Sequence, residues 1–191
     1  MKRHLSHLFV FTFCLGRVVQ ISSAAGPSFV AKCSPEIQEM FVSKDVTFKE
    51  AEEKVIKPFL SVKENASLSD DEKKAELSKI GLGDGEYGCA KAALNAYTCE
   101  AALKHPSLHI NACTPGWIAT DLTKGYAEKQ GKSPAEVGMK TPEEGARVAV
   151  HLMMGQLETE ETGRFYGSDA VRSPLHKYRS PGAPAYNGEF P

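Results

Sequence analysis

The stretch Tyr87-Gly88-Cys89-Ala90-Lys91 opens a run that ends at His105 and predicts one helix. The run is rich in alanine and leucine, which are strong helix formers. Tyr87 and Lys91 are four positions apart, so on a helix their side chains lie on one face. A neighbouring ammonium lowers the pKa of a phenol, and such a phenol can exchange a proton with a carbonyl or an alcohol. The alternative is a surface pair on an ordinary helix, because so short a motif often occurs by chance.

Length and composition are those of an ordinary globular protein. The chain has 191 residues, which suits one domain, with 41% hydrophobic and 25% charged residues. The formal net charge of −1 gives no general attraction to nucleic acid or to an anionic membrane. We therefore expect neither nucleic acid nor a membrane among its stable partners.

The cysteines and histidines suggest neither a disulfide framework nor a metal centre. The five cysteines are irregularly spaced and form no Cys-x-x-Cys pair: Cys14, Cys33, Cys89, Cys99 and Cys113. Free thiols in a reducing, cytoplasmic compartment are the simpler interpretation. The six histidines do not cluster with cysteines or carboxylates at metal-ligand spacing, so we predict no metal site.

Residues 1–15 resemble the beginning of a secretory signal peptide. The basic start Met1-Lys2-Arg3-His4 precedes the apolar run 8–15, and small residues follow at positions 22–25. The apolar run is too short to span a membrane. Two interpretations remain open: a signal peptide over 1–25 that sends the protein to the secretory route, or a hydrophobic segment that precedes a buried strand.

Three segments have the pattern of strands. Residues 16–23 are apolar and β-branched, residues 108–113 alternate apolar and polar, and residues 163–168 form the third. Ligands of open parallel sheets bind beyond the carboxyl ends of the strands. The first segment ends in two serines and the second in a turn that contains Thr120, so hydroxyls at both places are candidate ligand contacts. The alternatives are serines that only cap a turn and a plain Pro-Gly turn.

Helix signals fill much of the remaining sequence. Residues 33–80 contain Ser34-Pro35, typical of a helix start, and capping-box patterns at Thr47 and Ser69, which together predict two or three helices. A further capping box at Thr141 predicts a helix that ends near residue 155. The tail at 173–191 is rich in proline and glycine and is expected to form loops.

Together these segments resemble the short-chain dehydrogenase/reductase family, and in particular its monomeric carbonyl reductases. Four motifs carry the resemblance: the strand end Gly-Arg-Val-Val-x-x-Ser-Ser at 16–23, Tyr87-x-x-x-Lys91, the turn at 111–121 with Pro115-Gly116-Trp117, and Gly-Arg-Phe-Tyr at 163–166. The helical segment at 33–80 resembles the insertion of the monomeric branch, which covers the surface where oligomeric relatives pack. The resemblance implies a monomer with an α/β fold, in which residues 16–191 form the C-terminal part of a Rossmann-like, doubly wound parallel sheet.

The resemblance also implies a site that reduces small carbonyl compounds to alcohols with NADPH. NADH remains an alternative, because no residue of the chain selects between the two. Ser23 is expected to hydrogen-bond to the substrate carbonyl, Tyr87 to donate the proton, and Lys91 to lower the pKa of Tyr87 and hold the nicotinamide ribose. The residues expected to line the nicotinamide, besides Tyr87 and Lys91, are Pro115, Gly116, Ile118 and Thr120.

Several motifs of the family have no counterpart in these 191 residues. They are the glycine-rich turn Thr-Gly-x-x-x-Gly-x-Gly that seats the pyrophosphate, the residue that selects the adenosine ribose, and a further catalytic asparagine. We therefore expect impaired catalysis. The alternatives are a non-catalytic remnant or pseudoenzyme, and a small secreted protein. A strand edge left without a neighbour is also expected to favour association.

Overall fold

The computed structural model describes residues 16–157 and 162–189, and every statement below concerns these residues. Four strands form one sheet in the order β1-β2-β3-β4, with β1 at Gly16–Ile21, β2 at Leu108–Cys113, β3 at Phe165–Tyr166 and β4 at Arg172–Ser173. The first three are parallel, with Val18 opposite Ile110 and Ala112 opposite Phe165. The predicted α/β fold with a parallel sheet is confirmed, whereas the signal-like segment at 1–15 lies outside the described residues.

The sheet contains one strand more than the sequence predicts. β1 and β2 follow the predicted segments closely, and β3 is a two-residue part of the third. β4 runs antiparallel to β3 and places Arg172 beside Tyr166. It follows a tight turn in which Ala170 has a φ of 58° and the Gly167 N–H donates to the Val171 carbonyl at 2.9 Å. Two residues are too few to show a strand period, so the sequence pattern does not reveal β4.

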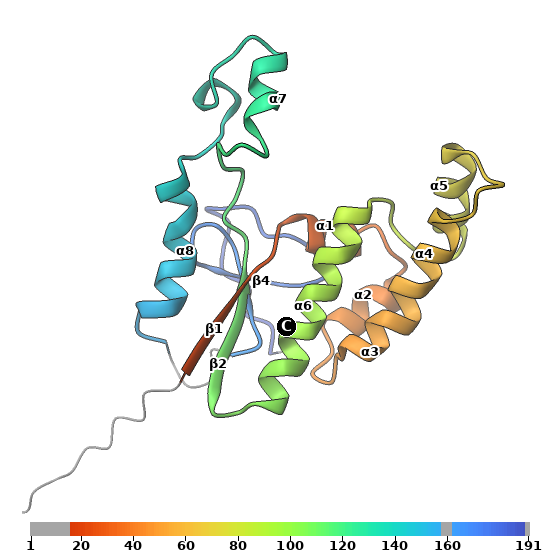
Figure 1. Ribbon diagram of the computed structural model, residues 1–191. Coiled ribbons are helices and arrows are strands. Elements are labelled where there is room, and N and C mark those ends of the chain that lie inside the picture. Colours follow the sequence, from red (N-terminus) through yellow and green to blue (C-terminus); the bar gives the residue numbers. More distant parts are fainter. Residues whose placement is uncertain (1–15, 158–161, 190–191) are drawn as a thin grey trace, which may run out of the picture.

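Helices cover both faces of the sheet, as Figure 1 shows. α8 (Pro142–Met154) packs on β1 and β2 on one face, and α6 (Glu86–Lys104) packs on β2 on the other. The remaining elements on the α6 side are α1 (Ala25–Val30), α2 (Pro35–Phe41), α3 (Phe48–Ala51), η1 (Glu52–Ile56), α4 (Lys57–Lys63) and α5 (Asp70–Lys79). α7 (Lys124–Lys129) projects away from the sheet, and the short turn η2 (Ala135–Val137) follows it.

α6 is the helix predicted from the Tyr87 stretch, and both of its ends agree with the prediction to within one residue. His105 ends the helix directly before Pro106, whose ring disfavours the helical conformation in the preceding residue. The buried face of α6 consists largely of small side chains, namely Cys89, Ala92, Ala93, Ala96 and Cys99. These small residues let α1 and β2 pack closely against it.

Two of the predicted capping boxes are complete. The Ser69 hydroxyl accepts a hydrogen bond from the Glu72 N–H, and the Glu72 carboxylate accepts one from the Ser69 N–H at 2.8 Å. The same reciprocal pair joins Thr141 and Glu144 at the start of α8. At Thr47 the hydroxyl half of the motif forms. Each such cap contributes about 1 kcal/mol to helix stability and fixes where the helix begins.

The core has a larger part on the α6 side of the sheet, a smaller part on the α8 side, and a third small cluster of Ala101, Ala102 and Ile110 where the end of α6 meets β2. The larger part joins α1 and α6 to the helices of residues 33–80, and in it the Phe29 and Phe59 rings meet edge to face with centroids 5.8 Å apart. The smaller part lies between the sheet and α8 and contains Cys113, Val148, Leu152 and Tyr166. The helices of residues 33–80 therefore share one core with the helix that carries Tyr87.

α1 and α6 approach each other so closely at Gly88 that a side chain does not fit there. A Cβ on Gly88 would lie 2.8 Å from the Phe29 Cβ and 2.9 Å from the Ala25 carbonyl oxygen. We expect Gly88→Ala to lower the free energy of unfolding by about 1–3 kcal/mol, because overpacking outweighs the gain in helix propensity. Urea denaturation measures this change.

The matched control for Gly88 is Gly125, a helical glycine in α7. A Cβ there would meet no atom within 4 Å. Gly125→Ala is therefore expected to leave the free energy of unfolding unchanged or to raise it by up to about 1 kcal/mol. Equal stability of the two alanine variants would contradict the close packing of α1 on α6.

The four described cysteines are free and buried: Cys33, Cys89, Cys99 and Cys113. Burial raises the pKa of Cys89, Cys99 and Cys113 from an ordinary 9.0 to about 12. As the pH rises above 9.0, the thiols of the unfolded chain ionise first, which favours unfolding. We therefore expect the contribution of these thiols to stability to be complete below that pH and to be lost progressively as the pH rises toward 12.

Urea denaturation at a series of alkaline pH values tests this expectation. Lysine and tyrosine also titrate in this range, so the double variant Cys99→Ala, Cys113→Ala serves as the control. The free energy of unfolding of the double variant should fall less steeply with pH than that of the natural chain. If the free energy of unfolding fell equally steeply with pH in the two proteins, the pKa values of these thiols would not change on folding.

Candidate active site

One cleft of about 620 Å³ lies where the carboxyl end of β1, the turn after β2, and the N-terminal parts of α6 and α8 meet. Six of the seven predicted site residues line this cleft: Ser23, Tyr87, Pro115, Gly116, Ile118 and Thr120. The seventh, Lys91, lies beside Tyr87 and does not line the cleft. Residues that are nearly a hundred positions apart in the sequence are thus brought to one place.

The two serines at the end of β1 have different surroundings. Ser22 is 3% exposed, and its N–H donates to the Cys113 carbonyl at 2.8 Å as a continuation of the β1–β2 pairing. Ser23 lines the cleft, and its Oγ accepts a hydrogen bond from the Ala25 N–H at 3.2 Å. Since a hydroxyl both donates and accepts, Ser23 caps the turn and still has an O–H to donate to an oxygen in the cleft.

Tyr87 and Lys91 are neighbours on the first turns of α6, as their spacing predicts. Tyr87 is 59% exposed at the cleft. The Lys91 Nζ lies 5.6 Å from the centroid of the Tyr87 ring and donates a hydrogen bond to the Ile21 carbonyl at 2.8 Å. The attraction between the ammonium and the ring holds the two together, and the bond to Ile21 ties this pair to the end of β1.

The turn after β2 forms the opposite side of the cleft. Gly116 has a φ of 88°, a conformation that disfavours other residues, and its N–H donates to the Thr114 hydroxyl at 3.2 Å. Farther along, the Ala119 N–H donates to the Lys140 carbonyl at 2.9 Å, and the Lys140 N–H donates to the Trp117 carbonyl at 2.8 Å. This short bridge fixes the turn against the residue that precedes α8.

The cleft also has lining residues that the sequence does not predict. They are Ile21, Trp117, Leu122, Thr123, Pro142, Gly145, Ala146 and Ala149. The capping box at Thr141 locates the start of α8 in the sequence, but the contact of its first turns with the cleft is a tertiary feature. Trp117, a large aromatic residue within a Pro-Gly turn, is the sequence signal that points to a lining residue of the cleft. Its ring is partly exposed and meets the Tyr126 ring edge to face.

A second hollow of about 390 Å³ adjoins the cleft and shares Ser23, Gly116 and Trp117 with it. Its other wall comes from Ser168, in the loop between β3 and β4, and from Tyr178, in the segment after β4. Burial raises the pKa of the Tyr178 phenol, and hydrogen bonding to Ser168 opposes that rise in part. Ser23 therefore stands between two connected spaces that differ in their lining.

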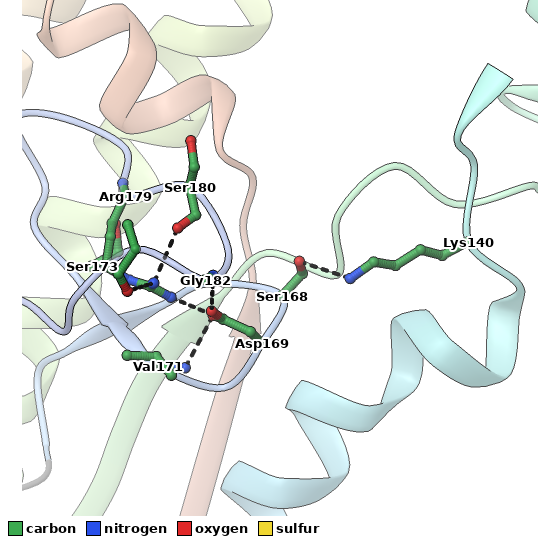
Figure 2. Close-up of polar contacts among 9 residues, drawn as sticks. Lys140, Ser168, Asp169, Val171, Ser173, Arg179, Ser180 and Gly182 are labelled. Carbon is green, nitrogen blue, oxygen red and sulfur yellow. Dashed lines mark hydrogen bonds and ion pairs between the residues drawn. The ribbon is translucent and has the colours of Figure 1, made fainter.

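Figure 2 shows the polar network that joins the β3–β4 loop to the segment after β4. The buried Arg179 guanidinium donates to the Asp169 carboxylate and to the Ala183 carbonyl, the latter at 2.7 Å. Burial by itself would raise the pKa of Asp169, but hydrogen bonds from Arg179, Gly182 and Val171 outweigh it and hold the pKa below its ordinary value. This wall of the second hollow thus consists of two segments that are hydrogen-bonded to each other, and the charges of Asp169 and Arg179 are paired.

Within residues 16–157 and 162–189, no three histidine, cysteine or acidic side chains are placed to hold a metal ion. In the same part of the chain, no helix combines the length and the apolar character needed to cross a membrane.

Comparison with known proteins agrees with this geometry, although no family model matches the sequence. NADPH carbonyl reductase 1 of Macaca fascicularis is 30% identical over 151 residues, which are 76% of this chain and 47% of that protein. The human carbonyl reductase 1 is 30% identical over 145 residues, which are 73% of this chain and 45% of that protein. Salutaridine reductase from Papaver somniferum superposes with a TM-score of 0.51 at 25% identity, over 78% of this chain and 44% of that chain.

The parallel sheet, the cleft at its carboxyl edge and these matches define the class of protein: the chain belongs to the short-chain dehydrogenase/reductase family. Within that family, the two curated relatives described above are NADPH carbonyl reductases. The chain spans about half the length of these relatives.

Proposed function

We propose that the cleft reduces small carbonyl compounds to alcohols with NADPH. The observation that carries this proposal is the presence of Ser23 and Tyr87 on one cleft, with the Lys91 ammonium beside the Tyr87 ring. A hydroxyl and a phenol that face the same space can both act on one carbonyl oxygen. The matched relatives are named as NADPH carbonyl reductases, which supports the same reaction class for this cleft.

Each of the three side chains has a part in the reaction that we assign. Ser23 donates a hydrogen bond to the carbonyl oxygen of the substrate and orients it. Tyr87 gives its phenolic proton to the same oxygen while hydride adds to the carbonyl carbon, so that the C=O bond becomes an alcohol. Lys91 places a positive charge where negative charge develops on the phenol, and it holds the nicotinamide ribose.

The cofactor supplies the hydride, and the lining of the cleft suits its nicotinamide end. Pro115 and Ile118 offer apolar contact for a flat ring, and Thr120 offers a hydroxyl for a carboxamide. Gly116, with its positive φ, shapes the turn so that its backbone reaches the cleft. The names of the matched NADPH carbonyl reductases favour NADPH over NADH.

The cofactor-binding residues assigned above contact only the nicotinamide and its ribose, which form one end of the dinucleotide. We therefore propose that this chain binds NADPH weakly and reduces carbonyls slowly. The test uses the purified 191-residue chain with an excess of NADPH and an aromatic aldehyde. Aldehyde-dependent loss of NADPH absorbance is expected, and NADPH should raise the melting temperature, since a ligand that binds only the folded state stabilises it. Absence of both effects would favour the non-catalytic alternative for this chain.

We further propose a monomer in the cytoplasm. Four free, buried thiols are consistent with a reducing compartment. The exposed side chains of Val18 and Ile21 on β1, which lies at one end of the four-stranded sheet, are the part of the surface that could instead favour association. Sedimentation of the purified chain over a range of concentrations distinguishes the two, and a dimer at low concentration would rule out the monomer.

A further inference from the structure

Lys140 is held firmly at the second hollow by its backbone. Two hydrogen bonds, from its N–H to the Trp117 carbonyl at 2.8 Å and from the Ala119 N–H to its carbonyl at 2.9 Å, join it to the turn after β2. The next residue, Thr141, begins α8 with a complete capping box. The backbone of Lys140 is thus fixed by hydrogen bonds at this residue and at the next one, so its side chain extends from a well-defined position at the rim of the hollow.

As Figure 2 shows, the side chain of Lys140 points toward Ser168 in the loop after β3, and both residues line the hollow. Its Nζ donates a hydrogen bond to the Ser168 hydroxyl at 3.0 Å. An ammonium has three donors, so this neutral partner leaves two of them for other acceptors. No ion pair joins Lys140 to a carboxylate in the described part of the chain.

Lys140 is the one charged side chain among the described residues that line the hollow. The lining contains hydroxyls, aromatic rings and Lys140, and it contains no acidic side chain. The nearby Arg179 has its charge paired with Asp169, whereas the charge of Lys140 faces the space that Ser23 also lines. A half-buried cation with spare donors, opposite neutral groups, favours an anion that brings its own oxygens.

We infer that the hollow is a binding subsite for an anionic group, specifically a carboxylate, and that Lys140 recognises it. The inference rests on the proposed function to the extent that the carboxylate belongs to the carbonyl substrate. Ser23 lines both spaces, so one small molecule can place its carbonyl at Ser23 and its carboxylate at Lys140. The substrate class is then carbonyl compounds that also carry a carboxylate.

A purely structural role for Lys140 makes a different prediction. If its ammonium served only to hold Ser168, the protein would bind charged and neutral carbonyl compounds equally well. A carboxylate that binds the ammonium instead gains a charge-assisted hydrogen bond, which is about twice as strong as a neutral one. The two roles are therefore separated by comparing a carboxylate with its neutral ester.

The probes are para-carboxybenzaldehyde and its methyl ester, which share one aldehyde and differ in charge. Trp117 is the single tryptophan of the chain and lines the hollow, so its fluorescence reports binding without any turnover. We expect the carboxylate to bind about tenfold more tightly than the ester. This preference should weaken as salt is added, because salt screens the charge. Equal affinities in the natural chain would overturn the inference without any variant being needed.

Three variants assign the preference to Lys140. In Lys140→Met the two probes should bind equally, and in Lys140→Arg the preference should remain. Lys132→Met is the matched control, because Lys132 is an exposed lysine of the same connection and does not line the hollow. A preference that survives in Lys140→Met, or that is lost in Lys132→Met, would overturn the inference.

Steady-state reduction of the two probes with NADPH separates this inference from the proposed function. A carboxylate preference in binding without any reduction would leave the subsite standing and count against carbonyl reduction by this chain. Reduction of both probes with equal kcat/KM, unchanged in Lys140→Met, would leave the function standing and refute the subsite.

Discussion

Tyr87→Phe is expected to lower the rate of carbonyl reduction by about 100- to 10,000-fold, which is the range that a positioned general acid contributes. Phenylalanine lacks the phenolic hydroxyl that donates the proton. It keeps the aromatic ring, whose centroid lies 5.6 Å from the Lys91 ammonium in the natural protein. Because the ring stays, NADPH should raise the melting temperature as it does in the natural chain. Comparable reduction rates in the two proteins would refute the role of Tyr87 as proton donor.

Tyr97→Phe is the matched control for this experiment. Tyr97 lies on the same helix, is also exposed, and its ring meets Phe48 rather than the cleft. Losing its hydroxyl should leave the rate within about twofold of the natural protein, because this hydroxyl is remote from the Ser23 cleft. A similar loss of rate in both variants would indicate a general effect on α6 rather than on the chemistry.

Phe29→Ala is expected to lower the free energy of unfolding by about 3–5 kcal/mol, the range for removing a buried aromatic ring. Phe29 is 2% exposed, meets the Phe59 ring edge to face, and belongs to α1, which directly follows Ser23. So large a loss is a considerable share of the stability of a domain of this size. The change in urea midpoint at constant slope measures it.

Phe48→Ala is the matched control, because it removes an exposed phenylalanine ring instead of a buried one. Phe48 is 36% exposed and its ring meets Tyr97 at the surface, so truncation leaves a smaller void. We expect it to cost no more than about 1 kcal/mol. If Phe29→Ala were as mild as Phe48→Ala, the core that joins α1 to α4 and α6 would be less tightly packed than the contacts imply.

The sequence predicts the regular elements well and their arrangement less well. The Tyr87 helix, the strand at 108–113 and the caps at Ser69 and Thr141 depend on local patterns, and these are found where the patterns place them. β4, α1 and α7 are missed, because a two-residue strand and six-residue helices are too short to show a period. The family resemblance, rather than any local pattern, predicts the parallel arrangement of the sheet.

The site shows the same division. The family resemblance implies seven site residues, and the structure gathers six of them on one cleft. The contribution of α8, and the position of Lys140 opposite Ser168, depend on how distant segments pack, and no local pattern in the sequence encodes that. The family resemblance selects Ser23 rather than Ser22, and in the structure the pairing of β1 with β2 extends to the Ser22 N–H while Ser23 lines the cleft.

The pairing of β1 with β2 also constrains how the chain can fold. Val18 pairs with Ile110, so the two strands are separated by about ninety residues, and most of the helices lie between them. Closing so long a loop carries an entropic cost that no contact repays until both strands are in place. During synthesis, the backbone of β1 stays unpaired until β2 emerges, while the helices from α1 to α6 emerge and can pack first. The cleft at the end of β1 is thus among the last parts of the protein to form.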